Sequence, residues 1–256
     1  VSSTHSHEAR DTVGIWGASV SDSGYTPAYM TFFREQAAQA VAEAVASLEF
    51  ADFEIANFLL RDVDTSSDPG VQTDVLRYVG DNRDPFIFDD QVRVLRFVAA
   101  DGVGGTTGTT DTIATFINYA AHPEYEGSRN TIMSSDFAGW MRNVVEDGGI
   151  GPDGTMLAGV GGISVFVNGA VGVQIGPNYI HPAEWDGTAL ADERAEARTV
   201  GEQLGWHILN ALVSPTETHD GFPLAFRRAR FPILVQNTNY HIAFGQMLFG
   251  PRALID

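Results

Sequence analysis

The pattern of apolar and polar positions switches along the chain between the period of a helix and that of a strand. Apolar side chains recur at helical spacing through residues 27–48, and a proline at the start suits a first helical turn. We therefore expect a helix here that packs into the core. A second helix should run to about Val145, and Ser134 or Ser135 with Asp136 can cap it.

Strand-like runs are rich in apolar and β-branched residues, as buried strands are. They cover residues 53–60, 92–99 and 112–121, two segments broken by glycines within 155–175, and a final region at 222–237, while a third helix is expected over 189–213. The Gly/Thr stretch 101–111 is predicted to be a hairpin tip, because it lacks a lysine and leads into a strand rather than a helix. We expect one α/β domain over residues 1–256, with a mixed β-sheet core flanked by helices.

Composition narrows the classes of partner and cofactor. The chain has 15 basic residues, all arginine, against 33 acidic residues, and its net charge of -18 disfavours nucleic acid and anionic membranes. No run approaches the roughly 20 apolar residues of a membrane helix. Because there is no cysteine, any metal must be held by His, Asp, Glu, Tyr or water.

Two histidines, His5 and His7, stand one residue apart near the start of the chain. In an extended segment, side chains at i and i+2 point to the same face, which is a plausible start for a metal site. A short polar terminus with two solvated histidines is the alternative. A third histidine, His122, follows an apolar strand, where a rigid scaffold presents a side chain to a loop-built pocket.

Three motifs occur in an order that resembles the neutral ceramidases. They are THSH at residues 4–7, the strand end YAAHP at 119–123, and NTIMSSDFAG at 130–139. The family has a T-H-T-H motif, an F-A-T-H motif and an N-T-x-x-I-S-G-D-N-like motif in the same order. The resemblance extends by motif over roughly residues 1–180.

The resemblance implies an α/β catalytic domain with a zinc ion bound by His5 and His122, and with His7 facing the substrate or its oxyanion. It also implies an arginine near the reacting oxygen, for which Arg61 is the first candidate and Arg83 the competitor. In the family, a Glu and a Tyr complete the metal site far downstream. We therefore expect the chain to be a central piece or one subunit of a processed protein, with further polypeptide supplying a carboxylate.

The main departure from the family lies in residues 166–182, where Gly176 stands in place of the serine nucleophile. Gly176, Asn178 and His181 in this region are candidate substrate-binding residues. Without that serine, a zinc-bound hydroxide could attack an amide or ester carbonyl directly. A metal-activated Ser134 or Ser135 is the alternative, although helix capping is the simpler explanation of both serines.

The sequence therefore predicts a zinc-dependent hydrolase of an amide or ester bond, acting on a small-molecule or lipid-like N-acyl substrate. A ceramidase-like protein that binds or assembles without catalysis is the second hypothesis, and a structural protein with incidental histidines is the third. A secreted, periplasmic or cell-surface location is expected.

Overall fold

A computed structural model describes residues 2–14, 17–19, 22–60, 78–80, 89–100, 111–127, 130–172, 174–176, 180–219, 227, 229 and 236–245. By its contacts the chain divides into two compact units, Val1–Ala9 with Ser47–Phe222 and Arg10–Ala46 with Pro223–Asp256. Each unit is described by itself. The expected single domain over residues 1–256 stays a prediction.

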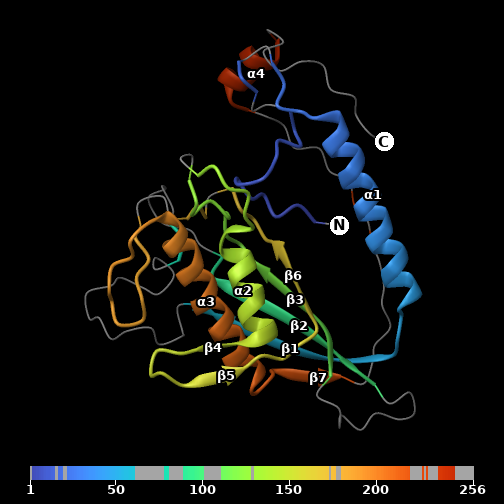
Figure 1. Ribbon diagram of the computed structural model, residues 1–256, viewed down its shortest axis with the longest axis vertical. Helices are drawn as coiled ribbons and strands as arrows, with labels where there is room; N and C mark the ends of the chain where they lie inside the picture. Colours follow the sequence, from blue (N-terminus) through green and yellow to red (C-terminus); the bar gives the residue numbers. More distant parts are fainter. Residues whose placement is uncertain are drawn as a thin grey trace. The chain divides into compact units, whose positions relative to one another are not determined.

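The first unit is built on a five-stranded mixed sheet with the strand order β6-β3-β2-β1-β7 (Figure 1). The strands are β1 (Ala51–Leu59), β2 (Gln91–Ala99), β3 (Thr112–Tyr119), β6 (Ile163–Asn168) and β7 (Glu217–His219). β2 pairs antiparallel with both β1 and β3, β7 pairs antiparallel with β1, and β6 pairs parallel with β3. The predicted mixed α/β sheet with helices is confirmed.

Two helices, α2 (Asp136–Asp147) and α3 (Glu193–Leu212), pack side by side on one face of this sheet (Figure 1). Buried residues of both helices, such as Met141 of α2 and Leu204 of α3, join the core that also holds Ile117 of β3. Asp192 caps α3 by accepting a hydrogen bond from the backbone N–H of Ala195 at 2.8 Å. A short hairpin, β4 (Gly148–Ile150) and β5 (Met156–Ala158), follows α2. The β segments predicted within 155–175 include β5 but not β4.

The opposite face of the sheet carries exposed apolar side chains near its β6 edge. Phe116, Ile163 and Val165 are 40%, 63% and 41% exposed, and Phe116 is the register partner of Val165. Alternate residues of a strand point to opposite faces, so these side chains cannot join the core beneath the helices. The expectation of further polypeptide beside this chain stays a prediction.

The second unit contains α1 (Pro27–Ala46) and α4 (Thr238–Gly245). The helix predicted at residues 27–48 is confirmed, and within its unit α1 has no buried residue, with Phe32 and Phe33 56% and 44% exposed. Its predicted packing into the core stays a prediction. Helical spacing of apolar residues marks a face without determining that it is covered. Most of the β region predicted at residues 222–237, and most of the predicted hairpin tip at 101–111, lie outside the described residues. No described helix has the length and apolar character needed to cross a membrane.

Candidate metal centre

The candidate site lies where the parallel strands β3 and β6 end. Parallel pairing runs from Ala114 with Ile163 to Tyr119 with Asn168, so the loops that follow both strands leave the same edge of the sheet. The backbone N–H of His122 donates to the carbonyl of Gln174 at 2.8 Å and ties these two loops together. His122 thus stands on a rigid support at a strand end, as its place in the sequence suggested.

The N-terminal segment, residues 4–8, is held against this edge by hydrogen bonds to three parts of the chain. The Asn168 side-chain amide donates to the carbonyl of Thr4, and the His7 N–H donates to the carbonyl of Pro123 at 3.3 Å. The Ser134 N–H donates to the carbonyl of Glu8, also at 3.3 Å. The segment is not a strand, and His5 has a φ of 62°, yet His5 and His7 both face His122.

The three imidazoles form a compact cluster. The ring centroids of His5 and His122 are 4.4 Å apart, those of His7 and His122 4.9 Å, and those of His5 and His7 5.2 Å. One ring nitrogen from each histidine lies within 4.8 Å of the other two. His122 is buried whereas His5 and His7 are exposed, so the cluster is anchored in the fold and open to solvent.

Two of the rings are oriented through their Nδ1 atoms by oxygen acceptors. Nδ1 of His122 lies 3.2 Å from the carbonyl oxygen of Val171, and Nδ1 of His7 lies 3.0 Å from Oε1 of Glu124. When Nδ1–H donates to such an oxygen, Nε2 of a neutral imidazole carries the lone pair. The Nε2 atoms of His7 and His122 are 3.0 Å apart, so a proton or a cation is needed between them.

This arrangement fits a metal ion. Two nitrogens at about 2.0–2.1 Å from one tetrahedral zinc lie about 3.3 Å apart, close to the observed separation of the two Nε2 atoms. Metal-binding histidines commonly donate their other N–H to a carboxylate or backbone carbonyl, as His7 and His122 do here. Burial, and after it the nearby charge of His122, lowers the pKa of His5, opposed by Glu124, which favours the neutral imidazole that binds metals.

Sequence reasoning missed Glu124. Its Oε1 pairs with His7, and its Oε2 lies 3.9 Å from Nε2 of His122. The signal that could have found it is its place two residues after His122 in HPE, on the loop that the strand end presents. The carboxylate expected from further polypeptide therefore has a counterpart within this chain.

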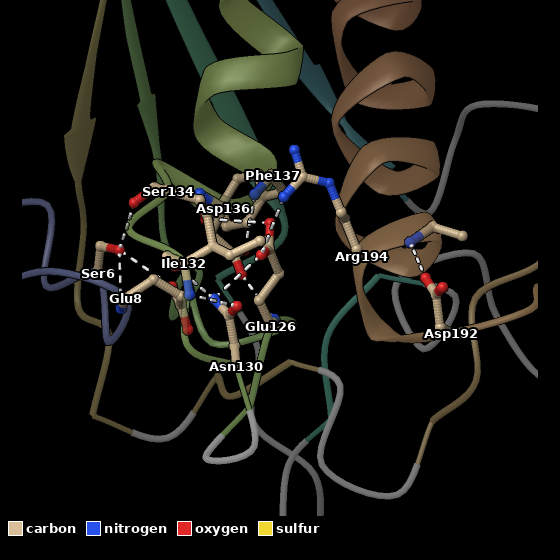
Figure 2. A network of polar contacts seen from close by, with 11 residues as sticks. Ser6, Glu8, Glu126, Asn130, Ile132, Ser134, Asp136, Phe137, Asp192 and Arg194 are labelled. Carbon is tan, nitrogen blue, oxygen red and sulfur yellow. Dashed lines mark hydrogen bonds and ion pairs between the residues drawn. The ribbon is translucent and has the colours of Figure 1, made fainter.

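Three further carboxylates lie beside the cluster, in the network drawn in Figure 2. The pKa of Glu8 is raised to about 7 by burial and then by the charge of Asp136, and the pKa of Asp136 is raised to about 6 mainly by burial. Ser134 donates to Glu126 at 3.0 Å and accepts from the Asp136 N–H at 3.0 Å, which supports a structural role for that hydroxyl. Ser135 occupies the N-cap position of α2 without making a side-chain cap, so that part of the capping prediction is wrong.

Of the remaining predicted site residues, His181 and Gly176 lie within the described part of the chain. His181 is exposed, its Nδ1 lies 3.6 Å from Oε1 of Glu196, and it borders a surface cavity that Glu126 also lines. Gly176 is buried, and a Cβ there would lie 2.6 Å from Cζ of Tyr125. Arg61 and Asn178, together with the competitor Arg83, lie outside the described residues. The substrate-binding role of Gly176, Asn178 and His181 and the place of Arg61 near the reacting oxygen stay predictions.

Comparison with known proteins finds similarity to solved structures at low sequence identity. No protein-family description and no curated protein matches the chain. Among solved structures, the chain is similar to one titled "Ceramidase complexed with C2", with 16% identity and a TM-score of 0.43 over 68% of this chain and 24% of that one. It is also similar to neutral ceramidase from Pseudomonas aeruginosa, with 16% identity and a TM-score of 0.42 over 69% of this chain and 25% of that one. The chain thus spans about a quarter of their length, and we base the function on the geometry of the site.

Proposed function

We propose that this protein is a zinc-dependent hydrolase of an amide or ester bond. The observation that carries the proposal is the pair of Nε2 atoms of His7 and His122, 3.0 Å apart, with His5 beside them. Histidine is a common zinc ligand, and three protein ligands with an open fourth position are typical of catalytic zinc sites. The exposure of His5 and His7 leaves room for a substrate to approach.

We propose that all three histidines bind the zinc ion. The motif resemblance implied only His5 and His122 as ligands, and the proposal adds His7. His7 was expected to face the substrate, but its Nε2 points at Nε2 of His122 and its Nδ1 is held by Glu124. That geometry is the one expected of a metal-binding histidine with an outer carboxylate. If the His7→Ala variant kept its zinc, His7 would not be a ligand and its expected role of facing the substrate would stand.

A zinc ion at this cluster would act as a Lewis acid and bring the pKa of a water towards neutrality. The residues of the chain then have separate tasks. Val171 and Glu124 fix the orientation of the His122 and His7 rings. Oε2 of Glu124, on a side chain that is 33% exposed and 3.9 Å from Nε2 of His122, would be the group to accept a proton from a water at this cluster.

Gly176 bears on the choice of nucleophile. In the described structure Gly176 packs against Tyr125, and a serine Cβ would overlap that ring. A mechanism that uses water rather than an enzyme hydroxyl is therefore the one this site supports. The motif resemblance to the neutral ceramidases favours a small-molecule or lipid-like N-acyl compound as the substrate.

The test combines metal analysis with turnover of a panel of N-acyl amides and esters, with and without a chelator. We expect about one zinc per chain, hydrolysis that chelation abolishes and zinc restores, and loss of zinc in His5→Ala, His7→Ala and His122→Ala. His219→Ala is the matched control, because His219 pairs with Glu217 away from the cluster. Absence of bound zinc would overturn the proposal, whereas zinc without turnover would favour a binding protein.

A further inference from the structure

Gln174 is a buried polar residue at the edge of the sheet where the candidate metal centre lies. It is 1% exposed and follows β6 in the chain. Its backbone carbonyl accepts the N–H of His122 at 2.8 Å, so it stands directly beside a proposed zinc ligand. Because a buried amide is costly unless its polar atoms are paired, the partners of this side chain indicate what it does.

Three hydrogen bonds occupy the Gln174 side chain. Its Oε1 accepts the backbone N–H of Asp89 at 2.8 Å, and its Nε2 donates to the Asp89 carbonyl at 2.9 Å. Nε2 also donates to the carbonyl of Ala120 at 2.5 Å. The side-chain amide therefore pairs with Asp89 much as one strand pairs with its neighbour, while its second N–H reaches another segment.

These bonds join three ends of the sheet. Asp89 precedes β2, Ala120 follows β3, and Gln174 follows β6. The start of β2 and the ends of β3 and β6 meet at one edge, because β2 is antiparallel and β6 parallel to β3. All three bonds go to main-chain groups, so the Gln174 side chain fixes the path of the backbone rather than the position of another side chain.

His122 depends on the loop after β6 in two ways. Its N–H donates to the Gln174 carbonyl, and its Nδ1 lies 3.2 Å from the carbonyl oxygen of Val171 on the same loop. Ala120, to which the Gln174 amide is bonded, is two residues before His122. A shift of this loop against the end of β3 would therefore move the oxygen that orients the imidazole.

We propose that Gln174 is a positioning residue of the metal centre. Its side-chain amide holds the loop after β6 on the ends of β2 and β3, which places the Val171 carbonyl at Nδ1 of His122 and leaves Nε2 to the metal. Gln174 acts through the backbone and is not itself a ligand. This inference rests on the zinc centre of the proposed function, and it does not depend on whether that centre hydrolyses a substrate.

The experiment compares Gln174→Glu with Gln203→Glu in the full chain. The first substitution keeps the shape of the side chain but removes the N–H donors that meet the carbonyls of Ala120 and Asp89. Gln203 is the matched control, because it is also 1% exposed and its amide donates to a backbone carbonyl, that of Ala183, at 2.9 Å. We expect Gln174→Glu to bind zinc about 10-fold more weakly and to change the visible absorption spectrum of the Co²⁺-substituted protein. Gln203→Glu should keep the wild-type zinc affinity and spectrum.

Circular dichroism establishes that each variant is folded. Wild-type zinc affinity and spectrum in a folded Gln174→Glu protein would overturn the inference. So would an equal loss of zinc affinity in both variants, which a general loss of stability would cause. A wild-type protein that binds no zinc would overturn the proposed function as well, so the two failures are distinguishable.

Hydrogen exchange in the wild-type protein gives a second measurement, which needs no variant to fold. Coupling between two sites is reciprocal, so a metal that depends on Gln174 should in turn steady the backbone that Gln174 holds. We expect zinc to slow exchange of the Asp89 N–H about 10-fold more than that of the Val160 N–H, which donates to the Val145 carbonyl at 2.9 Å. Equal slowing of both N–H groups would overturn the inference, because the metal would then act on the unit as a whole.

Discussion

Glu124 and Val171 show how single residues set the chemistry of the candidate metal centre. Each holds the Nδ1 atom of one imidazole, at 3.0 Å for His7 and 3.2 Å for His122, so that both Nε2 lone pairs face each other. A backbone carbonyl cannot be removed by substitution, but a carboxylate can. The contribution of an outer-shell group is therefore best measured at Glu124.

We predict that Glu124→Gln lowers zinc affinity by about 10- to 100-fold, a typical cost of losing an outer-shell carboxylate. Glutamine keeps the size of the side chain but offers His7 a weaker, uncharged acceptor. Competition with a chromophoric chelator measures the affinity. Glu217→Gln is the matched control, because Glu217 also pairs with a histidine, His219 at 2.9 Å, outside the cluster. Equal zinc affinity in both variants would show that Glu124 does not support the metal.

The loop after β6 determines whether a hydroxyl can stand where Gly176 lies. A Cβ added at Gly176 would meet the Tyr125 ring at 2.6 Å, whereas a Cβ at Gly172 would meet nothing within 4 Å. We predict that Gly176→Ser reduces the free energy of unfolding by about 1–3 kcal/mol, the usual cost of overpacking, and creates no new activity. Gly172→Ser should stay within about 0.5 kcal/mol of the wild type.

Chemical denaturation of the two serine variants decides this prediction. A Gly176→Ser protein as stable as the wild type would mean that Tyr125 has room to move. In that case the loop could accommodate the serine found in the neutral ceramidases.

The contact between α2 and α3 depends on two glycines in α3. A Cβ on Gly205 would lie 2.7 Å from Cβ of Val144 and 2.9 Å from the Met141 carbonyl oxygen, and one on Gly201 would lie 2.4 Å from the Phe137 carbonyl oxygen. Alanine favours a helix over glycine by about 1 kcal/mol, but close approach of the two helix backbones opposes it.

We predict that packing outweighs helix propensity, so that Gly205→Ala lowers the free energy of unfolding by about 1 kcal/mol or more. The measurement is equilibrium unfolding in urea followed by circular dichroism. A Gly205→Ala variant more stable than the wild type would show that the helices separate at little cost.

At the scale of the whole molecule, the metal centre joins segments that are far apart in sequence. His7 and His122 are separated by 115 positions, so an ion bound to both can stabilise only the folded chain. We predict that chelation lowers the melting temperature and that His122→Ala removes this sensitivity to chelator. Stabilisation is about 2.7 kcal/mol when free zinc is 100 times the dissociation constant.

Limited proteolysis gives a second measurement of the same coupling. Residues 4–8 should be cleaved faster in the chelated protein than in the zinc-loaded one, because the ion holds His5 and His7 on His122. Equal cleavage rates with and without zinc would contradict this, since the hydrogen bonds to Thr4, His7 and Glu8 would then be enough to hold the segment.

The sequence by itself determined the local structure. Periodicity placed β1, β2, β3, α1, α2 and α3 within a few residues of their observed bounds, because hydrophobic spacing and turn residues act over short distances. It also indicated His5, His7 and His122, since few residue types bind zinc in a chain without cysteine.

Only the tertiary structure decided how those elements and residues combine. The parallel pairing of β3 and β6 brings Val171 to His122, and the docking of residues 4–8 brings Glu8 to Glu126 and Asp136. The role of Glu124 was also decided at this level. The physical reason is that periodicity shows which side of an element is apolar, while the partner of that side depends on contacts between residues distant in the chain.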